Sequence, residues 1–108
     1  MMYYDFEVGN KVYKLRLNTR NTIALEKALG CNPLALFGDG DTLPTVSQMV
    51  NVLWASLQAY EHGISLNDTY DIFDKYLESH TMTDFFSVIV EVYKVSGLMP
   101  SGEVIEKN

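Results

Sequence analysis

Two short segments at the start of the chain alternate apolar and polar residues, which predicts a β-hairpin. Residues 2–8 and 11–17 carry the alternation, and Gly9-Asn10 between them tolerates the positive φ of a two-residue turn. One register gathers the apolar side chains on a single face, and it pairs Val8 with Lys11, Phe6 with Tyr13, Tyr4 with Leu15 and Met2 with Leu17. On the other face, the same register pairs Asp5 with Lys14. A shift of one residue would destroy both features.

A first helix is predicted directly after the hairpin. Asn18 or Thr19 can cap its start, and Gly30 suits the left-handed conformation that follows a helix ending near Leu29. A helix with these bounds is expected to turn one stripe toward the core, formed by Ile23, Ala24, Ala28 and Leu29.

A short helical turn and three more helices are predicted downstream. Asn32-Pro33 favours a turn through Phe37, before a flexible loop over 38–41. Thr45 with Gln48 and Ser65 with Asp68 are capping-box-like patterns, and they open helices that run to about Tyr60 and Leu77. The last element, about 83–96, alternates like a strand at its valines, but its length and the following Gly97 favour a helix.

These elements predict an α+β fold, mostly α, with an N-terminal β-hairpin followed by a small bundle of about four helices. The 108 residues have room for one hydrophobic core, so we expect a single domain over 1–98 and a flexible C-terminal tail over 99–108. Hydrophobic residues make up 47% of the chain and charged residues 20%, which is typical of a folded chain rather than a disordered one.

The charge is negative and uneven. The chain has 8 basic and 14 acidic residues, and this net charge of −6 argues against nucleic acid or an anionic membrane as partner. The excess of acidic residues falls in residues 55–108. An acidic helix face often only solvates the protein. The alternative is head-to-tail self-association, in which a basic group meets an acidic group of the next copy: Lys14, Arg16 and Arg20 against Asp68, Asp71 and Asp74.

The predicted helix over 46–60 is apolar nearly all round. One stripe suffices for a core, yet Val52, Trp54, Ala55 and Ala59 lie largely outside it. Such a helix is either surrounded by its own bundle or docked against a partner. If it docks, the residues expected to contact an apolar partner are Met49, Val52, Trp54, Ala55 and Ala59.

The sequence predicts no catalytic residues, no metal ligands and no cofactor, and we therefore expect a non-enzyme. His62 and His80 fall in separate predicted loops, and no serine has the surroundings of a nucleophile elbow. His80 and Asp84 alone are too few to hold a metal. Cys31, the single cysteine, is expected to be a small buried thiol in a reducing compartment. With no signal peptide or membrane-spanning segment in the sequence, we expect a cytoplasmic protein.

A series of short segments resembles the tail assembly chaperones of long-tailed, siphovirus-type phages and prophages. The resemblance covers roughly residues 4–98 and is a set of small signatures rather than one diagnostic motif. They are Tyr13 to Thr19 (YKLRLNT), Leu25 to Gly30 (LEKALG), Asn32-Pro33-Leu34, Leu53 to Tyr60, His62-Gly63-Ile64-Ser65, Tyr70-Asp71 and Ser96-Gly97.

The resemblance implies a small acidic protein of the host cell cytoplasm that binds the tape measure protein. It also implies homo-oligomers, absence from the mature virion, and recruitment of tail tube protein, mainly through a longer frameshifted form of which this chain would be the short version. Two alternatives stay open: a structural virion protein, such as a tail completion or connector subunit, and a small regulatory module that binds another protein or DNA.

Overall fold

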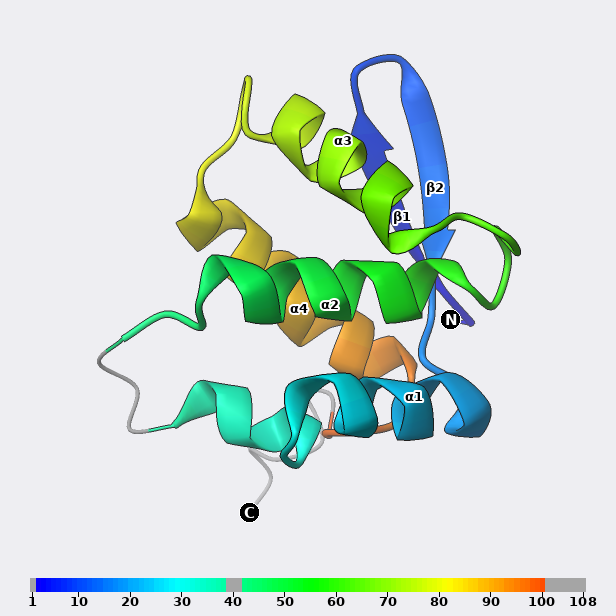
Figure 1. Cartoon of the computed structure of the whole chain (residues 1–108), viewed down its shortest axis with the longest axis vertical. Coiled ribbons are helices and arrows are strands. Elements are labelled where there is room, and N and C mark those ends of the chain that lie inside the picture. Colours follow the sequence, from blue (N-terminus) through cyan, green and yellow to red (C-terminus); the bar gives the residue numbers. More distant parts are fainter. Residues whose placement is uncertain (1, 39–41, 101–108) are drawn as a thin grey trace.

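The computed structural model describes residues 2–38 and 42–100, and it has the predicted α+β fold, mostly α. An N-terminal hairpin is followed by helices that gather around one core (Figure 1). Residues 39–41 of the predicted loop over 38–41 and residues 101–108 of the predicted tail over 99–108 lie outside the described residues. In chain order the elements are β1 (Tyr4–Val8), β2 (Lys11–Leu15), α1 (Thr19–Leu29), η1 (Pro33–Phe37), α2 (Val46–Leu57), α3 (Leu66–Tyr76) and α4 (Met82–Val95).

The hairpin has the predicted register. β1 pairs with β2 in antiparallel fashion, with Val8 opposite Lys11 and Asp5 opposite Lys14. Gly9 has a φ of 63° and Asn10 does not have a positive φ, which is typical of a type II′ turn with glycine first. Phe6 and Leu15 are buried on the inner face, whereas Val12 is exposed on the outer face. The predicted pair of Met2 and Leu17 falls beyond the strand ends.

Capping side chains begin each of the long helices. The Asn18 side chain accepts a hydrogen bond from the Asn21 N–H, and reciprocal capping boxes open α2, α3 and α4 at Thr45, Ser65 and Thr81. The last element is the helix that its length favoured, because Phe85, Val88, Ile89, Val92 and Tyr93 form one buried helical face.

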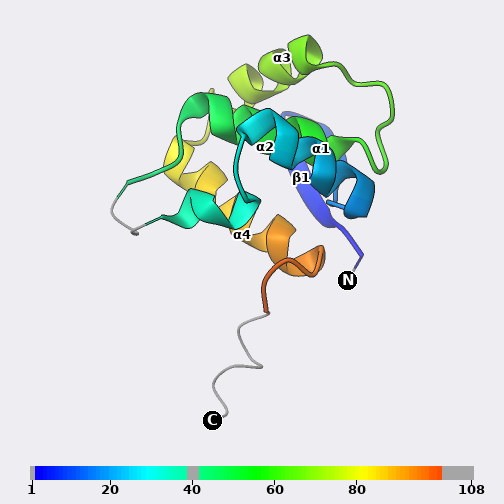
Figure 2. The ribbon, with the colours of Figure 1, turned by 60° about the horizontal axis from the view of Figure 1, so that its bottom comes forward.

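Helix α2 is the centre of the fold, and it packs against α1, α3, α4 and β2 (Figures 1 and 2). The expectation that Met49, Val52 and Ala55 are free to contact a partner is wrong, since each is at most 1% exposed. The chain covers them itself, because its neighbours reach α2 from several sides. Trp54 and Ala59 remain partly exposed. The helix ends at Leu57, before the predicted Tyr60.

The inner stripe predicted for the first helix is right for Ala24 and Leu29 and wrong for Ile23 and Ala28. Leu25 is the buried residue of α1, while Ile23 is 47% exposed and Ala28 is exposed. Ala24 and Leu29 are partly buried. The helix is therefore rotated so that the face through Leu25 meets α2, which is its main packing partner.

The segment after β2, Arg16 and Leu17, forms hydrogen bonds to parts of the chain that are distant in sequence. The Arg16 N–H donates to the Ser56 carbonyl oxygen at 3.0 Å, and the Leu17 N–H donates to Ser96 Oγ at 2.8 Å. Arg16 Nη1 donates to the carbonyl oxygens of Met2 and Val95, both at 2.9 Å. Arg16 therefore binds within its own chain, which corrects the expectation of a free basic side chain for self-association.

A buried hydroxyl joins α4 to the η1 turn. Tyr93 Oη donates to the Pro33 carbonyl oxygen at 3.0 Å, and its ring meets Phe37 edge to face at 5.5 Å. The pKa of Tyr93 is raised far above its ordinary value of 10, mainly by burial and to a smaller extent by the nearby Cys31. The chain beyond α4 also packs on the core, since Leu98 and Met99 contact it, so packing extends one residue past the predicted domain boundary.

We expect Tyr93→Phe to lower the free energy of unfolding by about 1–2 kcal/mol, because the buried Pro33 carbonyl loses its donor. The raised pKa of Tyr93 also means that the stability it supports is complete below pH 10 and is lost as the pH rises above it. Urea unfolding below and above pH 10 tests both points. The variant should lose less stability than the wild type above pH 10, and equal losses would contradict this role for Tyr93.

We expect Arg16→Met to lower the free energy of unfolding by about 1–2 kcal/mol, because two carbonyl groups lose a charged donor. Arg20→Met is the matched control, since Arg20 is exposed on the first turn of α1. Thermal unfolding at low protein concentration separates this effect from self-association. Equal stability of the two variants would show that the internal hydrogen bonds of Arg16 contribute little.

Candidate functional site

Among residues 2–38 and 42–100 there is no group of three or more His, Cys, Asp and Glu side chains that could hold a metal ion. His80 is exposed and stacks on the Tyr76 ring at 4.4 Å, with its Nδ1 in a hydrogen bond to Ser79 Oγ. Cys31 is a free, exposed thiol, so the expectation of a buried one is wrong; it follows the glycine that ends α1, in the connection to η1.

The predicted basic residues of self-association do not form one patch. Arg16 turns inward, and Lys14 Nζ lies over the rings of Tyr3 and Tyr60, at 5.0 and 5.9 Å from their centroids. Arg20 lies on α1, on the other side of α2 from α3 (Figure 1). The predicted acidic group is better defined, because Asp68, Asp71 and Asp74 are all exposed along α3.

An apolar groove lies between α2 and α3, with a volume of about 330 Å³. Val50 and Phe73 are buried at its floor, and Val46 and Tyr70, each 48% exposed, stand at its rim. Leu43, just before α2, is also exposed. We call the hollow itself the α2–α3 groove, and its lining residues are Val46, Ser47, Val50, Asn51, Tyr70, Phe73 and Asp74.

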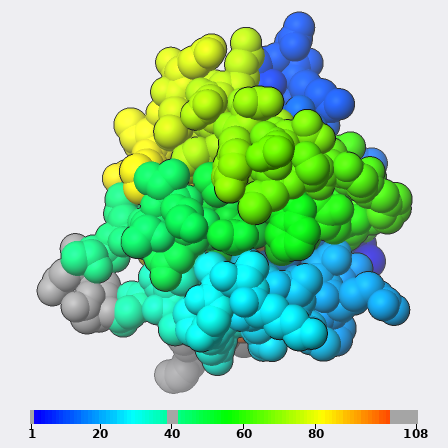
Figure 3. Space-filling model, viewed as in Figure 1, coloured from blue at the N-terminus to red at the C-terminus, as the bar shows by residue number. Residues whose placement is uncertain are grey.

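Some of the apolar side chains of α2 are exposed at this groove. Val46 and Tyr70 fit the helical core stripes of the sequence, and nothing in their spacing distinguishes them from buried positions. Val46 is the first residue of α2, and its side chain is 48% exposed. Trp54 lies one helical turn beyond Val50 and is partly exposed. The middle of α2 is visible as a band between α1 and α3 (Figure 3).

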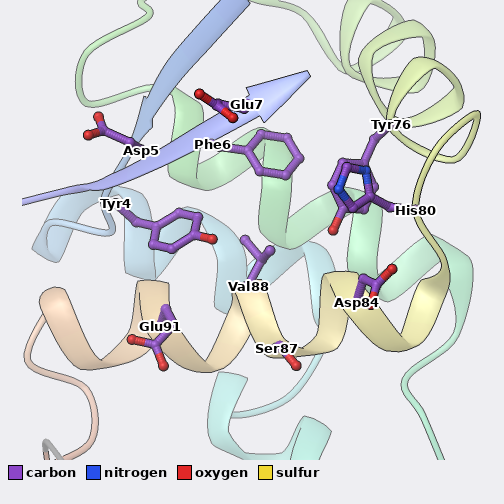
Figure 4. A pocket seen from close by; sticks show the side chains of 10 residues that line it. All are labelled: Tyr4, Asp5, Phe6, Glu7, Tyr76, His80, Asp84, Ser87, Val88 and Glu91. Atoms are coloured by element: carbon purple, nitrogen blue, oxygen red, sulfur yellow. The ribbon is translucent and has the colours of Figure 1, made fainter. Parts of the chain in front are cut away.

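A second cleft, of about 540 Å³, lies between β1 and α4 and is acidic (Figure 4). Burial is the main cause of the raised pKa of Tyr4, and the negative charges of Glu91 and Glu7 add to it. Burial, with smaller contributions from Asp84 and Tyr4, raises the pKa of Tyr76 to about 12. We call this surface the β1–α4 cleft. Its lining residues are Tyr4, Asp5, Phe6, Glu7, Tyr76, His80, Asp84, Ser87, Val88 and Glu91.

A third hollow, of about 360 Å³, lies between α1 and the residues that follow α4. Ile23 and Leu98 contribute apolar surface there, and a smaller neighbouring hollow of about 100 Å³ adds Leu34. Polar groups of Asn18, Thr19 and Thr22 make up much of the remaining wall. The mixed lining makes it a weaker docking surface than the α2–α3 groove.

Comparison with known proteins identifies a family but no characterised relative. No helix in the described part of the chain is both long and apolar enough to cross a membrane. No curated protein and no solved structure matches the chain. The sequence matches a family of unknown function, DUF6096, over residues 4–105, which is nearly its whole length. The chain therefore belongs to the DUF6096 family.

Proposed function

We propose that this protein is a phage tail assembly chaperone that binds the tape measure protein and helps to recruit tail tube subunits. The observation that carries the proposal is the α2–α3 groove, an apolar hollow beside the largely buried central helix. The resemblance of residues 4–98 to that chaperone family supplies the biological setting. The chaperone acts in the host cytoplasm and does not remain in the mature virion.

The groove suits an amphipathic helix. It lies between two helices, and it offers a buried floor at Val50 and Phe73 with exposed apolar side chains at Val46 and Tyr70. A partner helix that places apolar residues at helical spacing could bury these side chains together. A tape measure protein is a long helix-rich chain whose apolar stripes need cover before the tail tube surrounds it.

The polar rim of the groove gives the contact an orientation. Ser47, Asn51 and Asp74 line it beside the apolar residues. Asp74 continues the exposed acidic row of Asp68 and Asp71 on α3, so a helix with basic residues next to its apolar stripe is the better match.

The structure changes the residues that we assign to partner binding. Trp54 on α2 and Ala59 just after its end keep a role at the surface, because both are partly exposed. Met49, Val52 and Ala55 act through packing instead, since they hold α2 in place beneath its surface. Val46 and Tyr70 replace them as contact residues.

Homo-oligomers remain part of the proposal. The exposed aspartates of α3 and the exposed side chains of Lys14 and Arg20 are the charged groups available for contact between copies. Arg16 is removed from this set because its guanidinium group already binds two carbonyl groups.

Co-expression with a helical tape measure fragment tests the proposal, and the wild type should keep the fragment soluble and co-purify with it. We expect Val46→Glu to weaken binding about tenfold or more, since it places a charge in an apolar contact. The substitution should leave the fold intact, because an acidic side chain is favourable in the first turn of a helix.

Val12→Glu is the matched control, because Val12 is also 48% exposed but lies on the outer face of the hairpin. Equal binding by both variants would exclude the α2–α3 groove as the site. A fragment that stays insoluble with the wild type would reject the chaperone function. Detection of the chain in purified particles would favour a structural virion protein.

A further inference from the structure

The outer edge of β1 is unpaired. In the part of the chain that the structure describes, the sheet has two strands, so each strand has one free edge. Val8 and Lys11 close a two-residue turn and form a hydrogen-bonded pair, and the pattern alternates along an antiparallel ladder. Asp5 and Glu7 therefore direct their backbone N–H and C=O groups away from β2. Across residues 2–38 and 42–100, no hydrogen bond outside the hairpin engages these groups.

The β1–α4 cleft runs along this same edge. Side chains from both faces of β1 line it, with Tyr4 and Phe6 on the inner face and Asp5 and Glu7 on the outer face (Figure 4). A cleft that touches both faces of a strand lies at its edge rather than under one face. Residues of α4, from Asp84 to Glu91, form the facing wall. A segment placed against the edge would therefore have its alternate side chains in the cleft.

The chemistry of the cleft selects the charge of its occupant. Four of its lining residues are carboxylates, and none is Lys or Arg. Glu91 has Lys94 at 3.6 Å on its own helix, so the other three carboxylates carry most of the unbalanced charge. The four are Asp5, Glu7, Asp84 and Glu91.

We propose that the outer edge of β1 binds an extended segment of a partner protein that has Lys or Arg at alternate positions and adds as a third strand. Its backbone pairs with Asp5 and Glu7, and its basic side chains enter the β1–α4 cleft beside Tyr4 and Tyr76. The site is separate from the α2–α3 groove, so it goes beyond the proposed function and stands or falls independently of it.

A strand fits this edge better than a helix or a second β1. Only an extended backbone can satisfy a row of free N–H and C=O groups, because a helix uses its own internally. A second copy of β1 would bring Asp5 and Glu7 close to the same carboxylates of its partner, and like charges on neighbouring strands repel. A basic strand removes that repulsion.

The test uses the whole protein and a synthetic eight-residue peptide that alternates Lys and Val. Calorimetric titration at low salt should show one-to-one binding, and a peptide that alternates Glu and Val should not bind. Hydrogen exchange followed by NMR gives the second measurement. The peptide should slow the exchange of the Asp5 and Glu7 amides, because both gain acceptors in an added strand.

Two further changes separate strand addition from simple charge attraction. N-methylation of the peptide amides that face β1 should abolish binding while the peptide keeps its charge. Asp84→Asn, on the α4 wall beside Tyr76, should weaken binding about twofold to fivefold, as expected for the loss of one exposed ion pair, while the amide oxygen can still cap α4. Asp68→Asn is the matched control, since Asp68 has the same capping position on α3, and it should have no effect.

Three results would overturn the proposal. The first is no binding of the Lys–Val peptide at low salt. The second is equal binding after N-methylation with no protection of the Asp5 and Glu7 amides, which would show charge attraction alone. The third is sedimentation showing that the edge pairs instead with another copy of this chain, through the free edge of β2.

Discussion

The fold depends on the need to bury α2. Seven of its twelve residues are buried, and the apolar side chains point in nearly every direction around the helix axis. Burial of each large apolar side chain contributes about 1.5–3 kcal/mol, so no arrangement that leaves α2 on the outside could compete. The hairpin, α1, α3 and α4 each supply one wall.

The positions of the other elements follow from this requirement. Phe6 of the hairpin meets Phe85 of α4 at 5.7 Å and Tyr76 of α3 at 5.0 Å, so elements distant in sequence close over one aromatic cluster. The segment at Arg16 and Leu17 then joins the hairpin to the end of α2 and the end of α4 by hydrogen bonds. A residue that looks like a surface charge thus acts as an internal connection.

Two surfaces of different chemistry remain after α2 is covered. The α2–α3 groove is apolar, because Val46 and Tyr70 are exposed above the buried side chains of Val50 and Phe73. The β1–α4 cleft is acidic and lies along a strand edge with free backbone groups. The first is the surface that we propose for an amphipathic helix, and the second is the one that we propose for a basic extended segment.

Patterns that act over a few residues were readable from the chain alone. The hairpin register follows from the two-residue alternation of side chains, and the helix starts follow from caps such as Thr45 and Ser65, since both depend on neighbours in sequence. Exposure depends on elements far away along the chain. Packing between helices therefore decided that Met49 is buried, that Ile23 is exposed, that Arg16 turns inward and that Val46 stands at the rim of a groove.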